Sequence, residues 1–566
     1  MIPAIDDRLL PDHAAARSEN AWLYSGALQG IPKKQTLHEC ALAQTGKVYR
    51  LPEDYNNSAY LYNSKWLEFD NPDTDVIRSP VFGDEHDRYY WASSALPPKY
   101  NTRERIDDDD PEFLLGIPAP TVAPSCSPTG GSGATVTRSY VYTWVSAYGE
   151  EGPPSPPLVQ VGKIDDTWAL TLSAAAAGDL GTDRNLEKVR IYRTVTSVSG
   201  VTDFFLVAEQ DITDTTYSDT SSDAVVASHS LLESTTWSPP PSDLEGFATM
   251  PNGIVAAWRG NELWFCEPYR PHAWPPAYAL TVEYPIVGLG VHGQTLVVCT
   301  QSFPLTASGV SPRSITTGKL ASLEPCISRG SIVSAPEGVF YASANGLVLV
   351  ASGVADNVTK ELVTKDKWQQ LTKNSALRAA RLGTAYYAFG TVRPGVFEVD
   401  AFDEDAFAQE DFSGAFLGLL IDPANKNFGY NILTSETPTT GVQNDAWSGE
   451  IFILRDNKVW WIDQTDPLAE IEPCVWRSRI FQRQWKSNLG AMRVYFEVPA
   501  VPPVSNGNVK VYADGRLVLT RDLVTSGEIF RLPSGFKADF WQFEFSTSVK
   551  ILSVQAAGTV KELRAA

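Results

Sequence analysis

The sequence contains few methionines, few cysteines and no long apolar run, and each shortage excludes a class of protein. Its 566 residues include 3 Met and 6 Cys. The cysteines form no CxxC pair and follow no regular spacing, which argues against a disulfide framework and a structural zinc site. No apolar run reaches the roughly 18 residues of a membrane helix. The first residues also lack the basic and apolar regions of a signal peptide, so we expect neither a membrane span nor a leader.

Basic residues are scarce as well. Lys and Arg together number 46 against 67 Asp and Glu, which gives a formal net charge of -21. Such a surface does not bind the phosphate backbone of nucleic acid by releasing counterions. It does suit a wall along which nucleic acid slides, because like charges repel. The simpler alternative is that the acidity only keeps the protein soluble.

Motifs for catalysis are missing too. The sequence has no GxSxG, no Walker loop and no HExxH, and none of its 6 His stands in a metal-ligand spacing or beside a Ser or Cys motif. Asp84 and Glu85 near Arg88 form the kind of cluster that a sialidase-type hydrolase uses, but no supporting set of arginines accompanies them. We therefore predict a protein that is not an enzyme, with no catalytic residues, no cofactor and no metal site. A glycoside hydrolase remains the alternative, because paired carboxylates cannot be located from sequence.

Turn residues and aromatic residues are abundant. The sequence has 40 Gly, 39 Pro and 16 Trp, and its short β-branched and aromatic runs are separated by turns, which is typical of an all-β protein. The clearest example begins with the apolar run Ile254–Trp258. The turn Arg259–Asn261 follows, and Glu262–Cys266 returns, so this stretch predicts a β-hairpin.

Comparable hairpin units follow at intervals of about 35 to 50 residues, a structural repeat rather than a clean sequence repeat. We therefore predict a β-propeller, because each blade needs only its own hairpins and its neighbours. The alternative is a large β-sandwich without closure. One helix is expected from Val363 to Ala380, with Trp368 on its apolar face.

Four parts are predicted along the chain. Residues 1–117 form an N-terminal arm and the first blade, residues 236–470 the remaining blades, and residues 471–566 a C-terminal β unit. Residues 118–235 contain about seven short strands, the number expected for an immunoglobulin or fibronectin-III-like sandwich. The cross-sheet cysteine pair of immunoglobulins is missing there, since Cys126 stands alone, which favours the fibronectin-like version.

Two segments are candidate sites. The first is acidic and interleaved with Phe, and it is either a solvated connection or the lining of a channel. Its candidate lumen-lining residues are Asp400, Asp403, Glu404, Asp405, Glu410 and Asp411. The second combines basic residues with Trp. It suits stacking on nucleic acid but fits better a subunit interface with an acidic neighbour. Its candidate interface residues are Trp476, Arg477, Arg479, Arg483, Trp485 and Lys486.

The order of these parts resembles a known family, the tail nozzle proteins of short-tailed bacteriophages (tail tubular protein B-like). The motifs that carry the resemblance are dispersed along the chain. They are the opening from Leu9 to Asn20, the segment Asp84–Trp91, the unit GNELWFCEPYRPHAWP, the segment Trp476–Arg479, and RLPSGF followed by a C-terminal Lys561-Glu562-Leu563.

The resemblance implies a structural virion component without catalytic residues. It implies a homohexamer with a propeller in each subunit, placed in the phage tail below an adaptor and portal ring after synthesis in the host cytoplasm. Double-stranded DNA would pass through the lumen without specific binding, and tail fibres or a needle would be further partners. The rival function is a carbohydrate-binding adhesin, in which Trp91, Trp258, Trp264 and Trp274 stack on sugars.

Overall fold

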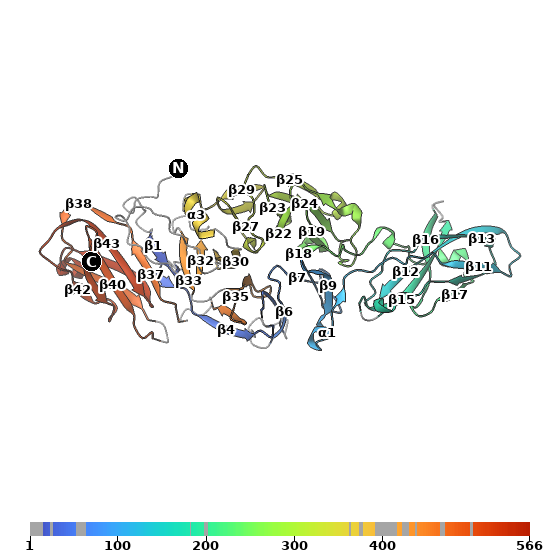
Figure 1. The fold of residues 1–566 in the computed structure, drawn as a ribbon, viewed down its shortest axis with the longest axis horizontal. Coiled ribbons are helices and arrows are strands. Elements are labelled where there is room, and N and C mark those ends of the chain that lie inside the picture. Colours follow the sequence, from blue (N-terminus) through green and yellow to red (C-terminus); the bar gives the residue numbers. More distant parts are fainter. Residues whose placement is uncertain are drawn as a thin grey trace. The chain divides into compact units, whose positions relative to one another are not determined.

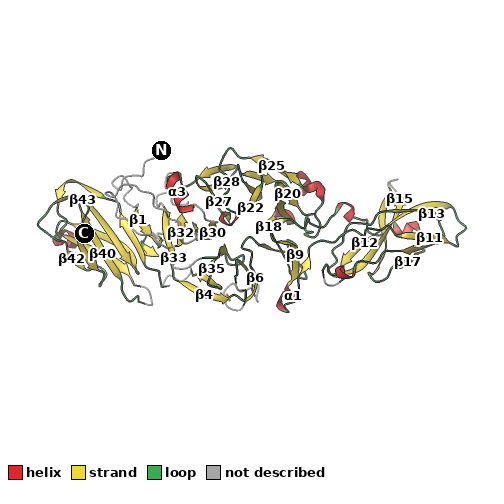
Figure 2. Ribbon diagram, viewed as in Figure 1, coloured by secondary structure: helices red, strands yellow, loops and turns green. Residues whose placement is uncertain are grey.

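The computed structural model describes residues 15–22, 27–42, 44–52, 64–180, 183–196, 202–360, 364–372, 377–390, 416–421, 430–435, 439–463, 470–498 and 502–565. In these segments strands predominate and helices are short (Figure 2). The protein is therefore all-β, as the turn-rich sequence predicts. The chain divides into two compact units, one of Met1–Pro72 with Ala321–Ala566 and one of Asp73–Leu320. Each unit is described by itself.

The unit Asp73–Leu320 contains four-stranded antiparallel sheets in which each strand pairs with the next strand along the chain. Three such sheets are described, with strand orders β10-β9-β8-β7, β18-β19-β20-β21 and β22-β23-β24-β25. A short helix, α1 (Arg103–Asp107), lies between β9 and β10. The strands are β7 (Asp75–Arg78), β8 (Arg88–Ser93), β9 (Leu96–Thr102), β10 (Phe113–Leu114), β18 (Glu245–Met250), β19 (Ile254–Arg259), β20 (Glu262–Phe265), β21 (Leu280–Thr281), β22 (Ile286–His292), β23 (Thr295–Thr300), β24 (Leu305–Ser308) and β25 (Thr316–Lys319).

The hairpin predicted from Ile254 to Cys266 is confirmed by β19 and β20. Arg259 pairs with Glu262, so the turn consists of Gly260 and Asn261. Gly260 has φ +54, and a positive φ at the first turn position matches the right-handed twist of the two strands. The residues of β19 are buried except Arg259 at its end, which places the hairpin in the interior of its unit.

Residues 125–219 form a two-sheet sandwich with its own core (Figure 1). Among the described residues of this segment, seven strands pair as β11-β14-β17 and β13-β12-β15-β16, the number of strands that the sequence predicts. Trp168 is completely buried in the core between the sheets, and α2 (Asp223–Val226) follows the last strand. The strands are β11 (Ser125–Thr129), β12 (Thr135–Ser146), β13 (Leu158–Lys163), β14 (Thr167–Thr171), β15 (Leu186–Thr196), β16 (Thr202–Asp211) and β17 (Thr216–Asp219).

The other unit repeats the same sheet pattern with one difference. Strands β26 to β29 form a sequential four-stranded sheet, but the sheet β34-β35-β36 takes its fourth strand, β4, from the beginning of the chain. A neighbouring hairpin pairs β5 with β6. The strands are β26 (Val333–Ala335), β27 (Gly338–Ser343), β28 (Gly346–Ala351), β29 (Val354–Asn357), β34 (Gly441–Asn444), β35 (Ile451–Arg455), β36 (Lys458–Ile462), β4 (Lys34–Glu39), β5 (Lys47–Pro52) and β6 (Ser64–Phe69).

The segment 1–117, predicted as an arm and a first blade, contributes strands to more than one sheet. Its strands belong to several sheets: β4 completes the sheet of β34 to β36, while β7 to β10 form a sheet of their own. The strand runs Val76-Ile77 and Tyr89-Tyr90-Trp91 are confirmed within β7 and β8. The alternation of residues within a strand identifies the strand itself. It does not identify a pairing partner distant in the sequence, such as β36 for β4.

The helix predicted from Val363 to Ala380 is only half correct. The helix α3 spans Lys365–Thr372, and Leu377–Leu382 forms strand β30 instead. Residues Leu377–Leu382 pair in an antiparallel register with Ala385–Gly390. Leu377 and Ala379 also pack in an apolar cluster with Trp368 of α3. Burial against β-sheet neighbours thus overrides the helix propensity of Ala and Arg in this segment.

A long mixed sheet joins the strands of residues 377–435 to the C-terminal β unit. Its order is β30-β31-β32-β33-β1-β37-β43-β40-β41, with β38 also paired to β43. Strand β1 is the joining element, parallel to β33 at Glu19 and Ile432 and antiparallel to β37. The strands are β31 (Ala385–Gly390), β32 (Phe416–Ile421), β33 (Tyr430–Ser435), β1 (Ala15–Glu19), β37 (Cys474–Ser478), β38 (Phe481–Ser487), β40 (Gly507–Ala513), β41 (Arg516–Asp522) and β43 (Ala538–Thr547).

A smaller sheet completes the C-terminal β unit. Its order is β42-β39-β44, and a core containing Met492, Trp541 and Phe545 lies between the two sheets. Helix α4 (Val560–Ala565) ends the described chain. The remaining strands are β42 (Ile529–Arg531), β39 (Ala491–Glu497), β44 (Lys550–Ala557) and the short pair β2 (Ala21–Trp22) and β3 (Gln29–Gly30).

Candidate interaction surface of the C-terminal β unit

The basic-aromatic segment predicted as an interface begins on a central strand. Strand β37 has partners on both edges, β1 and β43. The ring of Trp476 lies 6.3 Å from that of Phe545 and packs against the core of the C-terminal unit. Trp476 therefore belongs partly to the interior of the C-terminal β unit, and its indole gives little surface for a partner.

Arg477 has its acidic neighbour within the same chain. Its Nε donates to Glu544 Oε2 over 2.6 Å, and Lys510 Nζ donates to Glu544 Oε1 over 2.9 Å. The register places the three residues directly opposite one another on β37, β43 and β40, where opposite charges on one face stabilise a sheet. The Glu544 side chain is only 3% exposed. Burial alone would raise its pKa, but the hydrogen bond from Lys510 and the charge of Arg477 outweigh burial and lower the pKa.

No local pattern in the sequence identifies Glu544 as the partner of Arg477. The run Trp541-Gln542-Phe543-Glu544-Phe545 alternates, which places Glu544 on the face opposite the aromatic residues. Pairing of that face with Arg477 depends on the register between strands that are distant in the sequence. Arg479, beyond the end of β37, has its guanidinium 5.5 Å from the centre of the Phe481 ring, which is a cation–π distance.

The exposed part of the predicted interface is a protruding bulge in β38. Gln482 pairs with Phe540 and Ser487 with Ala538, so residues 483–486 oppose only Asp539 and must bulge away from the sheet. Trp485 in this bulge is 78% exposed. Arg483 is also exposed, and exposed Lys486 forms a long ion pair of 3.5 Å with Asp539. An exposed Trp between two cations has the composition of a protein–protein contact.

The six predicted interface residues thus separate into two groups. Trp476, Arg477 and Arg479 contact other residues of the same chain. Arg483, Trp485 and Lys486 form one exposed surface, which we call the β38 bulge. The acidic stretch from Asp400 to Asp411, predicted to line a lumen, lies outside the described residues.

The cluster of Asp84 and Arg88 has become a buried structural network rather than an open cleft. Arg88 donates through Nε and Nη2 to the two oxygens of Asp84, and through Nη1 to Glu150 Oε1 over 2.7 Å. Glu150 follows strand β12, so the network attaches the sandwich to the sheet of β7 to β10 within the same unit. Burial raises the pKa of Glu150 despite the charge of Arg88. Burial of His272, with the charges of Arg270 and Arg88, lowers the pKa of that imidazole to about 3.

The burial of this network indicates that it holds neighbouring segments together and does not act as the active site of a hydrolase. Glu150 and His272 have side chains that are only 5% and 6% exposed, so substrate cannot reach them without a rearrangement. His272 stays neutral near pH 7 because its pKa is so low. Among the described residues, its Nε2 and the hydroxyls of Tyr90 and Tyr100 have no hydrogen-bond partner, and buried water is the usual solution for such groups.

The sugar-stacking platform proposed for an adhesin is wrong in its named residues. Trp91 and Trp264 are about one-twentieth exposed, and Trp258 and Trp274 are buried almost completely. A sugar ring stacks only on an accessible aromatic face. Trp274 instead packs against Phe247 in an apolar core, at 6.0 Å between ring centres. These aromatic residues belong to buried strands. In the sequence alone, such a pattern looks the same as that of an exposed binding surface.

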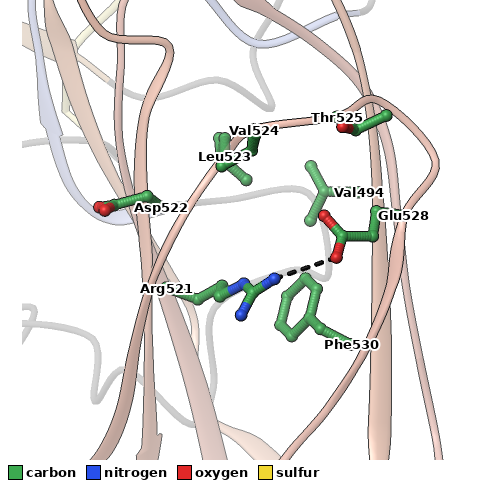
Figure 3. Close-up of a pocket in the computed structure, with 8 residues that line it drawn as sticks. All are labelled: Val494, Arg521, Asp522, Leu523, Val524, Thr525, Glu528 and Phe530. Carbon is green, nitrogen blue, oxygen red and sulfur yellow. Dashed lines mark hydrogen bonds and ion pairs between the residues drawn. The ribbon is translucent and has the colours of Figure 1, made fainter.

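The pocket shown in Figure 3 does not provide a substrate site. It lies in the C-terminal β unit, and its volume of about 10 Å³ holds about one water molecule. Arg521 and Glu528 face one another beside it, with Nη2 donating to Oε1 over 3.0 Å. Another cluster, His38, Cys40 and Glu68, has the side-chain chemistry of a metal site and is treated below. Within the described part of the chain, no helix has the length and apolar character to cross a bilayer.

Comparisons with known proteins leave the family open. No protein family matches the sequence, and no curated protein matches it. An extracellular domain of a putative one-component system from B. thetaiotaomicron is similar over 56% of this chain and 43% of its own, with 9% identity and a TM-score of 0.26. BBS1N, solved with ARL6DN, is similar over 70% of this chain and 93% of its own, with 8% identity and a TM-score of 0.26. Glutaminyl cyclase from Myxococcus xanthus covers 39% of this chain and 88% of its own, with 13% identity and a TM-score of 0.19. Scores this low support no functional argument.

Proposed function

We propose that this protein is a structural subunit of a short-tailed bacteriophage tail, a nozzle that forms a ring below the adaptor and portal and through which DNA is ejected. In this proposal the repeated four-stranded sheets are blades of a propeller, and the sandwich of residues 125–219 is an insertion. Support comes from the dispersed sequence resemblance and from the all-β fold built of sequential sheets. The pairing of β4 with β36 also resembles the way in which propellers close, with a strand from one end of the chain completing a blade of the other.

The observation that carries the proposal is the β38 bulge. The chain has a net charge of -21, yet here two exposed cations flank a Trp that is 78% exposed. Ring closure requires two different complementary surfaces on each subunit. The bulge is suited to one of them, because its Trp would lose apolar exposure and its cations would meet the acidic surface of the next copy.

The test is the mass of the purified protein by light scattering, alone and mixed with tail components. We expect a closed ring, or a monomer that becomes a ring on the adaptor. The double variant R483E/W485A should remain monomeric. R516E is the matched control, because Arg516 is exposed on β41 of the same β unit and the Arg-to-Glu change is identical. Charge reversal of Arg477 is unsuitable, because it would break the pairing with Glu544.

A monomer that ignores every tail component would refute the nozzle proposal. Assembly of R483E/W485A as readily as the wild type would instead refute the role of the β38 bulge and leave the ring intact. If the wild type is monomeric, glycan-array binding is the next measurement, since it would support the adhesin function on surfaces other than the four buried tryptophans.

A further inference from the structure

Three residues of the N-terminal segment bring together an imidazole, a thiol and a carboxylate. His38 is near the end of β4, Cys40 follows that strand directly, and Glu68 is on β6. Their ligand atoms all lie within 4.8 Å of one another. Residues two apart in an extended chain point to the same side, which explains why His38 and Cys40 both face the hairpin.

The cluster is held in place by its surroundings. The His38 ring stacks on Trp66 at 4.9 Å between centres and an interplanar angle of 13°. Glu68 Oε2 accepts hydrogen bonds from the backbone amides of Ala41 and Leu42, over 2.8 and 3.1 Å. The other oxygen, Oε1, lies 2.8 Å from His38 Nε2. A carboxylate with one oxygen fixed by amides and the other directed at an imidazole has the supporting shell that metal sites use.

We propose that His38 Nε2, Cys40 Sγ and Glu68 Oε1 bind a zinc ion, with water as the fourth ligand. Nitrogen, thiolate and carboxylate donors together suit zinc, whereas calcium and magnesium require oxygen donors. Zinc bonds of about 2.0 to 2.3 Å place neighbouring ligand atoms roughly 3.3 to 3.7 Å apart in a tetrahedron. Side-chain adjustments of about 1 Å therefore bring the three atoms into position.

Zinc binding releases one proton from this cluster and moves a second from one imidazole nitrogen to the other. Burial raises the pKa of the Cys40 thiol, and the charge of Glu68 adds to this effect, so the thiol is protonated without metal. Binding releases that proton to solvent and forms the thiolate. The imidazole carries its proton on Nε2 when it donates to Glu68, and it binds zinc through that atom as the Nδ1–H tautomer. The ion then joins the segment after β4 to β6, which belong to two different sheets. This inference is independent of the proposed nozzle function.

The experiment is the addition of Co²⁺ or Zn²⁺ to the full chain after treatment with a chelator. Cobalt reports its own ligands, because a Co²⁺–thiolate bond gives a charge-transfer band in the near ultraviolet and tetrahedral Co²⁺ absorbs strongly in the visible. We expect one equivalent of cobalt with both features, competed off by zinc. Zinc should also slow hydrogen exchange in residues 34–42 and 64–69.

Substitutions of the proposed ligands test which side chains bind the metal ion. C40S and H38N should each lower the affinity for cobalt by at least tenfold, which is the lower end of the effect for supporting partners of a ligand. C126S is the matched control, since Cys126 is also a half-buried thiol but lies in the sandwich. The proposal is overturned if the wild type shows no thiolate band, if the band survives in C40S, or if C126S loses it equally. The wild-type spectrum decides the question even if C40S fails to fold.

Discussion

A buried ion pair between Arg50 and Asp445 ties the first hairpin to the sheet of β34 to β36. Both side chains are 1% exposed, and the guanidinium donates through Nε and Nη2 to Asp445 Oδ2. The contact is reinforced next to it, because the Gln443 amide donates to the Val48 carbonyl over 2.6 Å and accepts from the Val48 amide. Asp445 also accepts from the amide and hydroxyl of Ser448.

We predict that D445L and R50M alone each destabilise this region by about 3 to 5 kcal/mol, because each leaves the opposite charge buried without its partner. The double variant R50M/D445L should recover most of the loss, because two apolar side chains of similar volume replace a pair whose desolvation is costly. Hydrogen exchange of β5 and β6 measures the effect. If the two single losses simply add in the double variant, the two residues are not coupled and the reasoning fails.

Three further predictions concern single residues. Burial, with the charges of Asp463 and Asp445, raises the pKa of Glu450 to about 7; its contribution to stability is therefore full below about pH 4.5 and falls as the pH rises through 7. The loss is about 1 kcal/mol after allowance for a partly exposed side chain, and E450Q should abolish this difference between denaturation midpoints at pH 5.5 and 8. D219N should cost about 3 to 5 kcal/mol, seen as lost exchange protection in the sandwich, because Asp219 is fully buried with Arg193 at 2.9 Å; unchanged protection would contradict this. G246A should destabilise β18 by about 1 to 3 kcal/mol, measured as a lower melting temperature, because Gly246 has φ +62 and its Cβ would lie 2.5 Å from the Trp258 ring.

Local patterns predicted strands and turns well. The hairpin around Gly260 follows from its glycine and its β-branched and aromatic flanks, and the sandwich follows from alternating runs such as Tyr140 to Trp144. These features depend on neighbouring residues, which a sequence displays directly. The helix from Val363 was extended too far because Leu377 to Ala380 suits both patterns, and only packing against Trp368 decides between them.

Partners distant in the sequence could not be predicted. Neither the addition of β4 to β36 nor the pairing of Arg477 with Glu544 has a local signal, because each depends on the register of strands. The proposed zinc cluster has only a weak signal in the sequence, which is that His38 and Cys40 stand two residues apart in a strand-like run. Its third member, Glu68, comes from another sheet and becomes visible only in three dimensions.

Buried ion pairs between sheets help each sheet to pack against its correct neighbour. Sequential four-stranded sheets present similar apolar faces, so apolar packing alone discriminates weakly between correct and incorrect neighbours. Arg50 with Asp445 is an ion pair between neighbouring sheets that only the correct neighbour completes, and Arg88 with Glu150 plays the same part between the sheet of β7 to β10 and the sandwich. Such pairs add little net stability, yet a wrong neighbour would leave a charge buried alone. R50M/D445L should therefore keep its melting temperature but refold with a larger misassembled or aggregated fraction than the wild type, measured by the yield of monodisperse protein after dilution from denaturant. An equal yield would show that apolar packing alone selects the neighbouring sheet.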